Sequence, residues 1–335
     1  MYQPETYGIA LLLMSISMIC WGSWPITMKF TPGWRFQLYY WDFVPGTVLT
    51  SLLLGLTLGS SRGGPSSFIS NLRQADGWHI LWAFLAGVVF DVANLLLVAA
   101  IEYAGLSVAF PIGVGVALVE GVLLNYFLAP KGNVIFLFGG VLLVLMAIVF
   151  DARAYRMREK GRPKTSGKGI AISLTCGVLL GLFYPLATKS FTGLNALGPY
   201  SLVFVSSLGA LLCNIPVNCV LMKRPLDGSL PLTAKDYFAG RMSFHWLGLL
   251  GGFVWCLGTV LSLVAANAHI VGPAVSYAVG QGCTMVSAVW GVFIWHEFSQ
   301  APAGARTQLA LMFLFFALGL AAVALAPIAS TLVPI

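Results

Sequence analysis

The sequence predicts an all-α integral membrane protein with ten transmembrane helices, arranged as two inverted five-helix repeats. Three observations lead to this fold class. First, 59% of the 335 residues are hydrophobic and only 9% are charged, whereas about a quarter of the residues of a soluble domain are charged. Second, the chain contains ten apolar stretches, each long enough to cross a bilayer. Third, short motifs in the first half of the chain recur in the second half.

The apolar stretches define the predicted elements. A helix needs about 20 mostly apolar residues to cross a hydrocarbon core roughly 30 Å thick. Helices are expected because lipid cannot satisfy free backbone donors and acceptors. The predicted spans are Tyr7–Met28, Phe36–Gly59, Trp78–Tyr103, Leu106–Leu128, Val134–Tyr155, Gly169–Phe191, Leu197–Met222, Phe244–Ala268, Val271–Trp295 and Leu309–Ala326. The third and fourth spans are separated only by Ala104 and Gly105, and the eighth and ninth are joined tightly around His269–Pro273.

A basic segment near the middle of the chain divides it into two parts. We expect residues 1–155 to form the first repeat, residues 156–168 a basic linker, and residues 169–335 the second repeat. The loop that holds this linker begins near Asp151 and ends near Lys168. Loops rich in Lys and Arg face the cytoplasm. The sequence therefore predicts a plasma (bacterial inner) membrane protein with a cytoplasmic central loop and both termini outside.

The two halves share motifs at corresponding spans. The matching pairs are Pro25 with Pro185, Lys29 with Lys189, and Val108–Gly115 with Val275–Gly282. An odd number of spans per repeat makes the halves insert with opposite orientation, a plan in which the solute site lies between the repeats near the midplane. The paired Pro and Lys residues are the predicted hinge or gate residues. The alternative is that apolar helices resemble one another by composition, and that the lysines only reach toward the headgroups.

Several classes of function are disfavoured by the sequence. The net charge is +7, but the basic residues lie in loops between apolar runs, so no nucleic-acid partner is expected. All six cysteines fall in apolar segments without a CxxC pair, which is typical of small buried side chains and not of a metal site. No phosphate-binding glycine loop, HExxH or GxSxG motif is present, so neither an enzyme nor a cofactor is predicted.

Acidic residues inside the spans are the candidate proton-coupling residues. A charged side chain at the centre of a lipid-facing helix costs roughly 2.5–3.5 kcal/mol, so such residues should face a cavity or another helix. The three candidates are Asp42, Asp91 and Glu120. A membrane-buried carboxyl group can carry a proton; the alternative is an ion pair or hydrogen bond between helices. Asp42 can pair with Lys29 or Arg35, and Glu102, near a helix end, is expected to reach the interface.

Aromatic and amide side chains near the prolines and polar faces are the candidate substrate contacts. They are Trp24, Trp41, Asn94, Tyr184, Tyr277, Gln281 and Thr284. Asn94 follows Asp91 by one turn on the same helix face. Gly280 and Gly282 flank Gln281, which allows a ligand to approach it closely. Flat rings beside hydrogen-bonding groups suit a sugar or a planar heterocycle.

Four segments resemble a known group of transporters. They are Cys20–Pro25 (CWGSWP), Arg35–Asp42 (RFQLYYWD), Gly105–Val108 (GLSV) and Leu124–Leu128 (LNYFL). Together with the two five-span repeats, they resemble the drug/metabolite transporter superfamily, in the branch of glucose/ribose porters, rhamnose–proton symporters and ureide permeases. The last two segments are most similar to ureide permeases. The central loop lacks the long insert and the phosphate-loop-like motif of plant members.

The resemblance implies import of a small neutral polar solute coupled to protons. The leading hypothesis is a secondary active transporter that imports a sugar by alternating access in the lipid bilayer. A ureide or nucleobase permease, for allantoin or uracil, is the first alternative. An exporter of drugs or metabolites is the second, and an integral-membrane enzyme is disfavoured by the missing catalytic motifs.

Overall fold

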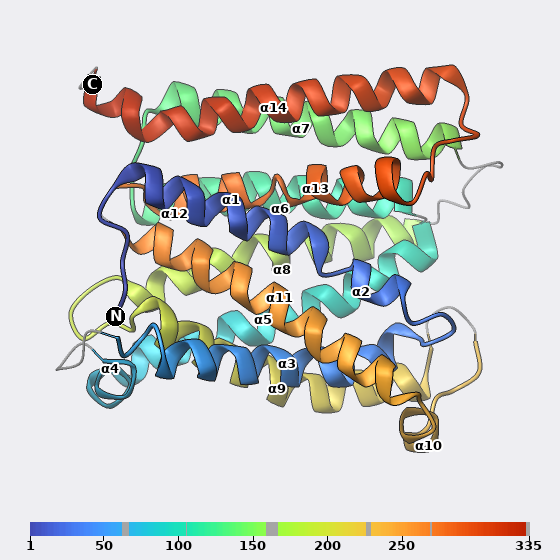
Figure 1. Ribbon diagram of the computed structural model, residues 1–335, viewed down its shortest axis with the longest axis horizontal. Coiled ribbons are helices and arrows are strands. Elements are labelled where there is room, and N and C mark those ends of the chain that lie inside the picture. Colours follow the sequence, from blue (N-terminus) through green and yellow to red (C-terminus); the bar gives the residue numbers. More distant parts are fainter. Residues whose placement is uncertain (62–66, 105, 159–166, 226–228, 269, 333–335) are drawn as a thin grey trace.

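The computed structural model describes residues 1–335 except 62–66, 105, 159–166, 226–228, 269 and 333–335 (Figure 1). Every regular element in this described part is a helix, and none is a strand. In chain order the helices are α1 Tyr7–Ser23, α2 Ile26–Lys29, α3 Phe36–Leu56, α4 Phe68–Gln74, α5 Gly77–Ala104, α6 Leu106–Leu128, α7 Val134–Arg158, α8 Gly167–Phe191, α9 Pro199–Lys223, α10 Ala234–Phe238, α11 Met242–Asn267, α12 Pro273–Gly280, α13 Cys283–Val289, η2 Trp290–Ile294 and α14 Ala303–Leu332.

Nine helical stretches within the described residues are long and apolar enough to span a membrane. They are Tyr7–Lys29, Gly77–Ile101, Pro111–Leu128, Val134–Arg158, Gly167–Phe191, Pro199–Lys223, Met242–Asn267, Pro273–Ile294 and Ala303–Ala329. Because irregular backbone cannot face lipid, an apolar chain of this kind has to form helices. The prediction of an all-α membrane protein is confirmed.

Helix α3 is the long helix that falls outside this set of nine. It contains 21 residues, which is enough to cross a bilayer, but several polar side chains are buried along it. These buried groups include Gln37, Asp42, Thr47, Thr50 and Ser51. They lower the hydropathy of α3, and the helix packs between α9 and α11, where neighbouring helices cover its polar face.

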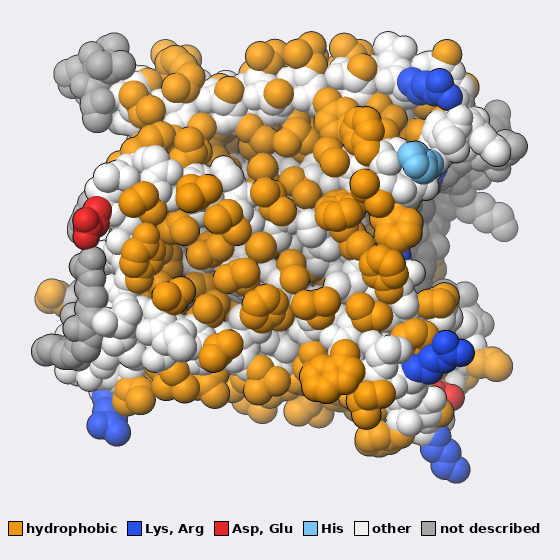
Figure 2. All heavy atoms as spheres, viewed as in Figure 1, with side chains coloured by type: hydrophobic (Ala, Val, Ile, Leu, Met, Phe, Trp, Pro, Cys, Tyr) orange, Lys and Arg blue, Asp and Glu red, His pale blue; other side chains and the backbone are white. Residues whose placement is uncertain are grey.

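The long helices run side by side between two ends of the molecule (Figure 1). Both termini lie at one end, and α7 ends and α8 begins at the other. Helices α7 and α14 pair along one edge, and α3 and α9 pair along the opposite edge. In the face shown in Figure 2, hydrophobic side chains cover the middle, while Lys, Arg, Asp and Glu lie near the two ends. This distribution is typical of a protein surrounded by lipid.

Two of the membrane-spanning stretches are interrupted near their middle or end. Helix α1 stops at Ser23 and α2 begins at Ile26, because Pro25 has no N–H to continue the hydrogen-bond ladder. The predicted ninth span, Val271–Trp295, corresponds to the membrane-spanning stretch Pro273–Ile294. It is divided into α12, α13 and η2, with the first break at Gln281 and Gly282.

Other boundaries also differ from the prediction. The loop expected from Asp151 starts later, because α7 continues to Arg158, and α8 already begins at Gly167. Residues 159–166 of the expected linker lie outside the described part of the chain. The short helices α4 and α10 stand in regions predicted to be loops; α10 begins with a capping box in which Thr233 and Asp236 satisfy each other's backbone.

Small residues let pairs of helices approach closely. A Cβ atom placed on Gly87 of α5 would lie 1.7 Å from the carbonyl oxygen of Ser206 in α9. Gly140 of α7 and Gly319 of α14 are in mutual contact, because a Cβ on either residue would lie within 3 Å of the other's carbonyl oxygen. Such close backbone contacts are typical of helix packing in membranes.

Candidate functional site

A central cavity of about 370 Å³ lies among helices from both halves of the chain. Its lining comes from α1, α2, α3, α5 and α6 of the first half of the chain and from α8, α11, α12 and α13 of the second half. The lining residues include Trp21, Trp24, Pro25, Phe36, Phe90, Asn94, Ile101, Phe183, Trp255, Tyr277, Gln281, Cys283, Thr284 and Ser287. Both interrupted spans contribute, through Trp24 and Pro25 at one break and Gln281 at the other.

Aromatic rings form much of the cavity wall. Phe90 of α5 stacks on Trp255 of α11, with ring centroids 4.1 Å apart and an angle of 29° between the planes. Phe183 of α8 packs against Phe90 at 5.4 Å. On α1, the indole N–H of Trp21 donates to Thr259 Oγ1 at 3.1 Å, which fixes the orientation of its ring. Stacked and fixed rings of this kind offer flat apolar surfaces to a solute.

Few polar side chains reach the central cavity. Asn94 Nδ2 donates to the carbonyl oxygen of Phe90 at 2.8 Å, so the amide is held in place by its own helix. Gln281 lies in the break between α12 and α13. The hydroxyl of Thr284, which is 3% exposed, has no hydrogen-bond partner among the described residues. Ser287 donates to the carbonyl oxygen of Gly22 at 2.9 Å and thereby connects α13 to α1.

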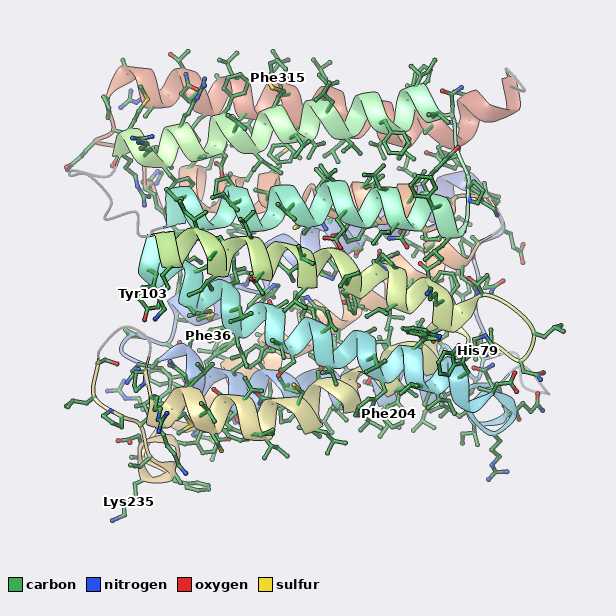
Figure 3. The ribbon with its side chains drawn as sticks, turned by 180° about the vertical axis from the view of Figure 1, so that it is seen from behind. Phe36, His79, Tyr103, Phe204, Lys235 and Phe315 are labelled. Carbon is green, nitrogen blue, oxygen red and sulfur yellow. The ribbon has the colours of Figure 1, made fainter. Side chains whose placement is uncertain are left out.

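The cavity extends toward the end of the molecule that carries Phe36, Tyr103 and Lys235 (Figure 3). At its other end, the hydroxyl of Tyr277 donates to the carbonyl oxygen of Ala117 at 3.1 Å. The predicted contact Tyr184 lies behind Tyr277, at a ring distance of 5.1 Å. Tyr184 is fully buried, is not among the lining residues, and its hydroxyl lies 2.9 Å from that of Ser262.

The predicted residues Trp41 and Asp42 lie away from the central cavity. The indole N–H of Trp41 donates to the sulfur of Met222 at 3.0 Å. Asp42 accepts a hydrogen bond from the Tyr237 hydroxyl at 2.6 Å and pairs with His245 Nδ1 at 2.8 Å. This carboxyl therefore connects α3 with α10 and α11. Lys29, one of the partners expected for Asp42, pairs with Glu297 instead.

The other two predicted carboxyls are also outside the cavity lining. Asp91 is fully buried, and neither of its oxygens has a hydrogen-bond partner among the described residues. The Cys213 thiol and the Tyr40 hydroxyl are near enough to Asp91 to interact with it electrostatically. Glu120 packs against Gly181 of α8. The side chain of Glu102 lies outside the described part of the chain.

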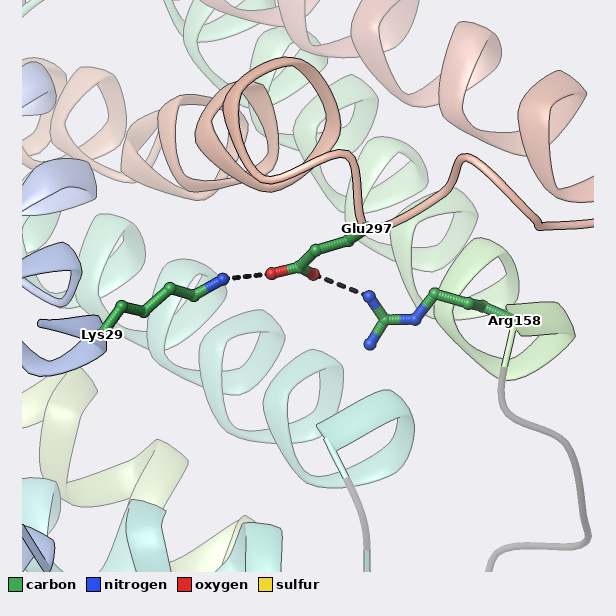
Figure 4. Close-up of polar contacts among 3 residues, drawn as sticks. All are labelled: Lys29, Arg158 and Glu297. Carbon is green, nitrogen blue, oxygen red and sulfur yellow. Dashed lines mark hydrogen bonds and ion pairs between the residues drawn. The ribbon is translucent and has the colours of Figure 1, made fainter. Parts of the chain in front are cut away.

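The predicted hinge and gate residues occupy opposite ends of the molecule. Pro25 separates α1 from α2, whereas Pro185 lies inside the continuous helix α8. The ammonium group of Lys189 lies 4.6 Å from the ring centre of Trp82, near His79. Lys29 forms an ion pair with Glu297 at the other end (Figure 4).

Glu297 joins three segments that are distant in sequence. Lys29 of α2 bonds one carboxylate oxygen, and Arg158 of α7 donates to the other at 2.7 Å (Figure 4). His296 has a left-handed φ of +51°, and the Glu297 N–H donates to the carbonyl oxygen of Gly291, so the chain turns back and presents the carboxylate. Burial raises the pKa of Glu297, but the bonds from Lys29 and Arg158 outweigh it and hold the pKa below its usual value.

This ion-pair network was not predicted from the sequence. The available signal was that Glu297 directly follows the last apolar span before α14, in a half of the chain that otherwise has few acidic residues. Its partner Lys29 is 268 positions away, so no local pattern joins the two.

Comparison with known proteins identifies the group to which this chain is similar. Ureide permease 1 of Arabidopsis thaliana is 26% identical, over 96% of this chain and 97% of its own length. A putative sugar uptake protein of Enterococcus faecalis (strain ATCC 700802 / V583) is 22% identical, over 86% of this chain and 90% of its own length. A crystal structure of a protein 16% identical in sequence shares the fold, with a TM-score of 0.60 over 94% of this chain and 97% of that one. The model of the sugar transport protein family matches residues 12–326. The chain therefore belongs to the sugar transport protein family and is an integral membrane transporter.

Proposed function

We propose that the protein imports a small neutral polar solute together with protons, by alternating access. The observation that carries this proposal is the central cavity, in which the breaks at Pro25 and Gln281 meet aromatic walls from both halves of the chain. Discontinuous helices are the usual places where transporters bind their solutes, since breaks bring backbone groups to the ligand.

The walls favour a flat solute with amide groups over a solute rich in hydroxyls. Rings such as Phe90, Trp255 and Trp24 can stack on a planar molecule, while Asn94 and Gln281 can each donate and accept hydrogen bonds. A sugar hydroxyl that is buried without a partner costs free energy, and the polar side chains of the lining are few. The cavity walls therefore favour a ureide or nucleobase as the substrate over the sugar, which was the leading hypothesis from the sequence.

A sugar is the second candidate substrate. Its support is the matched family, described as sugar transport proteins, and relatives named as putative sugar uptake proteins in Enterococcus faecalis and Lactococcus lactis. Relatives named ureide permeases support the first candidate. The words permease and uptake agree better with import than with the export of drugs or metabolites.

The packing of the helices supports ten spans in two inverted repeats. In this proposal α3 is the tenth span, and α1, α3, α5, α6 and α7 correspond to α8, α9, α11, α12–α13 and α14. The contact of α5 with α8 then has its counterpart in α11 with α1, and that of α5 with α9 in α11 with α3. Helices α7 and α14 pair with each other. Such reciprocal contacts are expected of two halves related by a twofold axis.

Asp91 is the proposed proton-coupling residue among the three predicted carboxyls. It is fully buried, and the only donor near its oxygens among the described residues is the weak Cys213 thiol. An ionised carboxylate in such a place is strongly disfavoured. Binding a proton removes this charge. A movement that exposes Asp91 to water would stabilise the carboxylate again and so release the proton. Asp42 has hydrogen-bonded partners, and Glu120 packs between α6 and α8, so both have weaker support.

The proposed gates lie at the two ends of the cavity. At the end that carries Lys29, opening requires Glu297 to separate from α2 or α7. At the end that carries Lys189, the packing of Tyr277 on Tyr184 closes the cavity. We assign the Lys29 end to the cytoplasm, in agreement with the positive charges of the central loop.

Uptake into proteoliposomes tests the proposal. Purified protein should accumulate labelled allantoin or uracil, and more weakly glucose, when the outside is more acidic than the lumen. With one proton per solute, a gradient of one pH unit supports an accumulation of about tenfold. Asp91→Asn should abolish accumulation, whereas Asp76→Asn, which changes an exposed carboxyl, should not. Transport of none of these solutes, or accumulation without a proton gradient, would refute the proposal.

A further inference from the structure

A second cavity of about 270 Å³ adjoins the central cavity at the Lys29 end. We name it the Asp151 cavity; Gly22, Pro25, Lys29, Asp151, Tyr155 and Trp295 are among its lining residues. Pro25, Thr284 and Ser287 line both cavities, so the two spaces are neighbours at these side chains. The Asp151 cavity has room for several water molecules, since one water needs about 10–15 Å³.

Three polar groups that line this cavity lack hydrogen-bond partners among the described residues. They are a carboxylate oxygen of Asp151, the hydroxyl of Thr284 and the indole N–H of Trp295. The residue Asp151 is only 6% exposed. Buried polar groups are normally satisfied by protein or by water. An acceptor, a donor and a hydroxyl around one space therefore indicate a site built to hold water or the polar groups of a solute.

Among the residues that the structure describes, no cation pairs with Asp151. Lys29 and Arg158 both bind Glu297, one at each carboxylate oxygen. Tyr155 lies one turn after Asp151 and is near enough to both Asp151 and Glu297 to interact with them electrostatically. Helix α14, which packs along α7, contributes no residue to the lining, and α6 contributes only Pro111.

An uncompensated carboxylate of this kind is most stable when it binds a proton. Charge at a buried site without a partner is disfavoured, and protonation of one oxygen removes it. The added proton also turns Asp151 into a hydrogen-bond donor for water or for a carbonyl oxygen of the solute. Asp151 can therefore alternate between a proton-loaded and a proton-free form as the water content of the cavity changes.

We propose that Asp151 is a second proton-binding residue of the transport cycle, placed where the solute leaves the central cavity toward the Lys29 end. This inference rests on the proposed function. It differs from the role of Asp91, which is sealed between helices away from both cavities. In the cycle, Asp151 binds a proton while the ion pairs of Glu297 close the end of the molecule. It releases that proton to water when they separate; no covalent bond other than O–H forms or breaks.

Infrared difference spectroscopy of the full-length protein in lipid nanodiscs tests this assignment without any solute. A pH titration should show a carboxylic acid C=O band that is absent from Asp151→Asn and shifted in Asp151→Glu. Asp76→Asn, at the opposite end, should retain the band. If all C=O bands of the wild type persist unchanged in Asp151→Asn, the assignment is refuted.

Transport measurements then separate the role of Asp151 from the proposed function. Asp151→Asn should lose at least tenfold in proton-driven accumulation but keep the exchange of labelled for unlabelled solute, since exchange needs no net proton transfer. Asp151→Glu should restore accumulation with a shifted pH profile. Unchanged accumulation in Asp151→Asn would refute the coupling role. If the wild type itself transports no solute while the infrared band is lost, the proposed function fails and proton binding by Asp151 stands.

Discussion

Glu297 shows how one residue can hold together parts of the chain that are far apart. Its carboxylate is bound from α2 and α7 while it belongs to the turn before α14 (Figure 4). Glu297 and Arg158 are half-buried and Lys29 is exposed, so water reaches the network. Ion pairs in contact with water contribute only about 0–1 kcal/mol each, which allows the network to open during transport. The cationic ends of Lys29 and Arg158 also lie over aromatic rings of Trp295 and Tyr155, which keeps both side chains in position.

Glu297→Gln should lower the midpoint of thermal unfolding in detergent at pH 7. Since the pKa of Glu297 is held below its ordinary value of 4.5, the ionised carboxylate stabilises the fold above that pH. The stabilisation is lost as the pH falls through the depressed pKa. The difference between wild type and variant should therefore be constant from about pH 7 to 5.5 and shrink below about pH 4.

Lys29→Met provides the matched comparison for this experiment. It removes one cation while leaving Arg158, so it should show a smaller difference with the same pH dependence. A difference between wild type and Glu297→Gln that stays constant down to pH 3 would contradict the ion-pair explanation.

Gln281→Ala should weaken solute binding. One hydrogen bond to a neutral group contributes about 0.5–1.5 kcal/mol, so the KM for uptake should rise about 2–10-fold with little change in kcat. Gln300→Ala, an exposed amide beyond η2, is the control and should leave the KM unchanged. An unaltered KM in Gln281→Ala would exclude a direct contact with the solute.

At the residue scale, local features of the sequence point to side chains that line one cavity. Asn94, Gln281, Thr284, Trp24 and Tyr277 were selected for their residue type and their position on a helix face, and all five line the central cavity. Their role as substrate contacts remains a proposal. Asp151 was placed at the start of a loop because it ends an apolar run, and only the contacts of α7 show that it is buried.

At the scale of elements, the break between α12 and α13 is the main difference from the sequence prediction. Gly280 packs on the ring of Trp21, and a Cβ atom there would lie 2.5 Å from Trp21 Cζ3. Periodicity reports where apolar residues recur, but a two-residue interruption within an apolar run leaves that pattern intact. Gly280 and Gly282, on either side of Gln281, are the local feature of the sequence that indicates this break.

Gly280→Ala should impair transport more than it impairs folding. The added methyl group would lie 2.5 Å from Trp21 Cζ3 in the wall of the cavity, which is too close for two carbon atoms, so the ring or α12 has to move. Uptake should fall about tenfold or more because Trp21 belongs to the cavity wall, whereas overpacking should cost the fold about 1–3 kcal/mol. The readouts are the initial rate of uptake and the midpoint of thermal unfolding.

Gly139→Ala is the matched control, because nothing lies within 4 Å of a Cβ atom at that position of α7. Alanine there improves helix propensity by up to about 1 kcal/mol, so stability should be equal or higher and uptake unchanged. Equal uptake in both glycine variants would show that the Trp21 contact is not needed.

At the scale of the whole molecule, the positions of the termini agree with an even number of crossings. Both termini lie at one end and the junction of α7 and α8 at the other (Figure 1). Composition alone predicted the helical class, since lipid leaves a long apolar chain few other structures. It could not predict which helices pair, because apolar faces are similar and the contacts depend on where glycines admit a neighbouring backbone.

Cysteine labelling in intact bacterial cells should fix the orientation. Leu194 is 88% exposed at the end that carries the termini, and Gln300 is exposed at the opposite end. A maleimide reagent that cannot cross the membrane should label Leu194→Cys and should label Gln300→Cys only after the cells are lysed. The reverse pattern would overturn the assignment of the Lys29 end to the cytoplasm.

The mutual contact of Gly140 and Gly319 has a consequence for following the motion of this protein. In an object whose halves exchange conformations about a twofold axis, points on that axis do not move. In the proposed inverted repeat α7 and α14 are corresponding helices, and the backbones of the two glycines rest on each other, so in that arrangement this crossing would lie close to the twofold axis. The distance from a spectroscopic probe on α7 beside this crossing to a probe on α13 should therefore report mainly the displacement of α13.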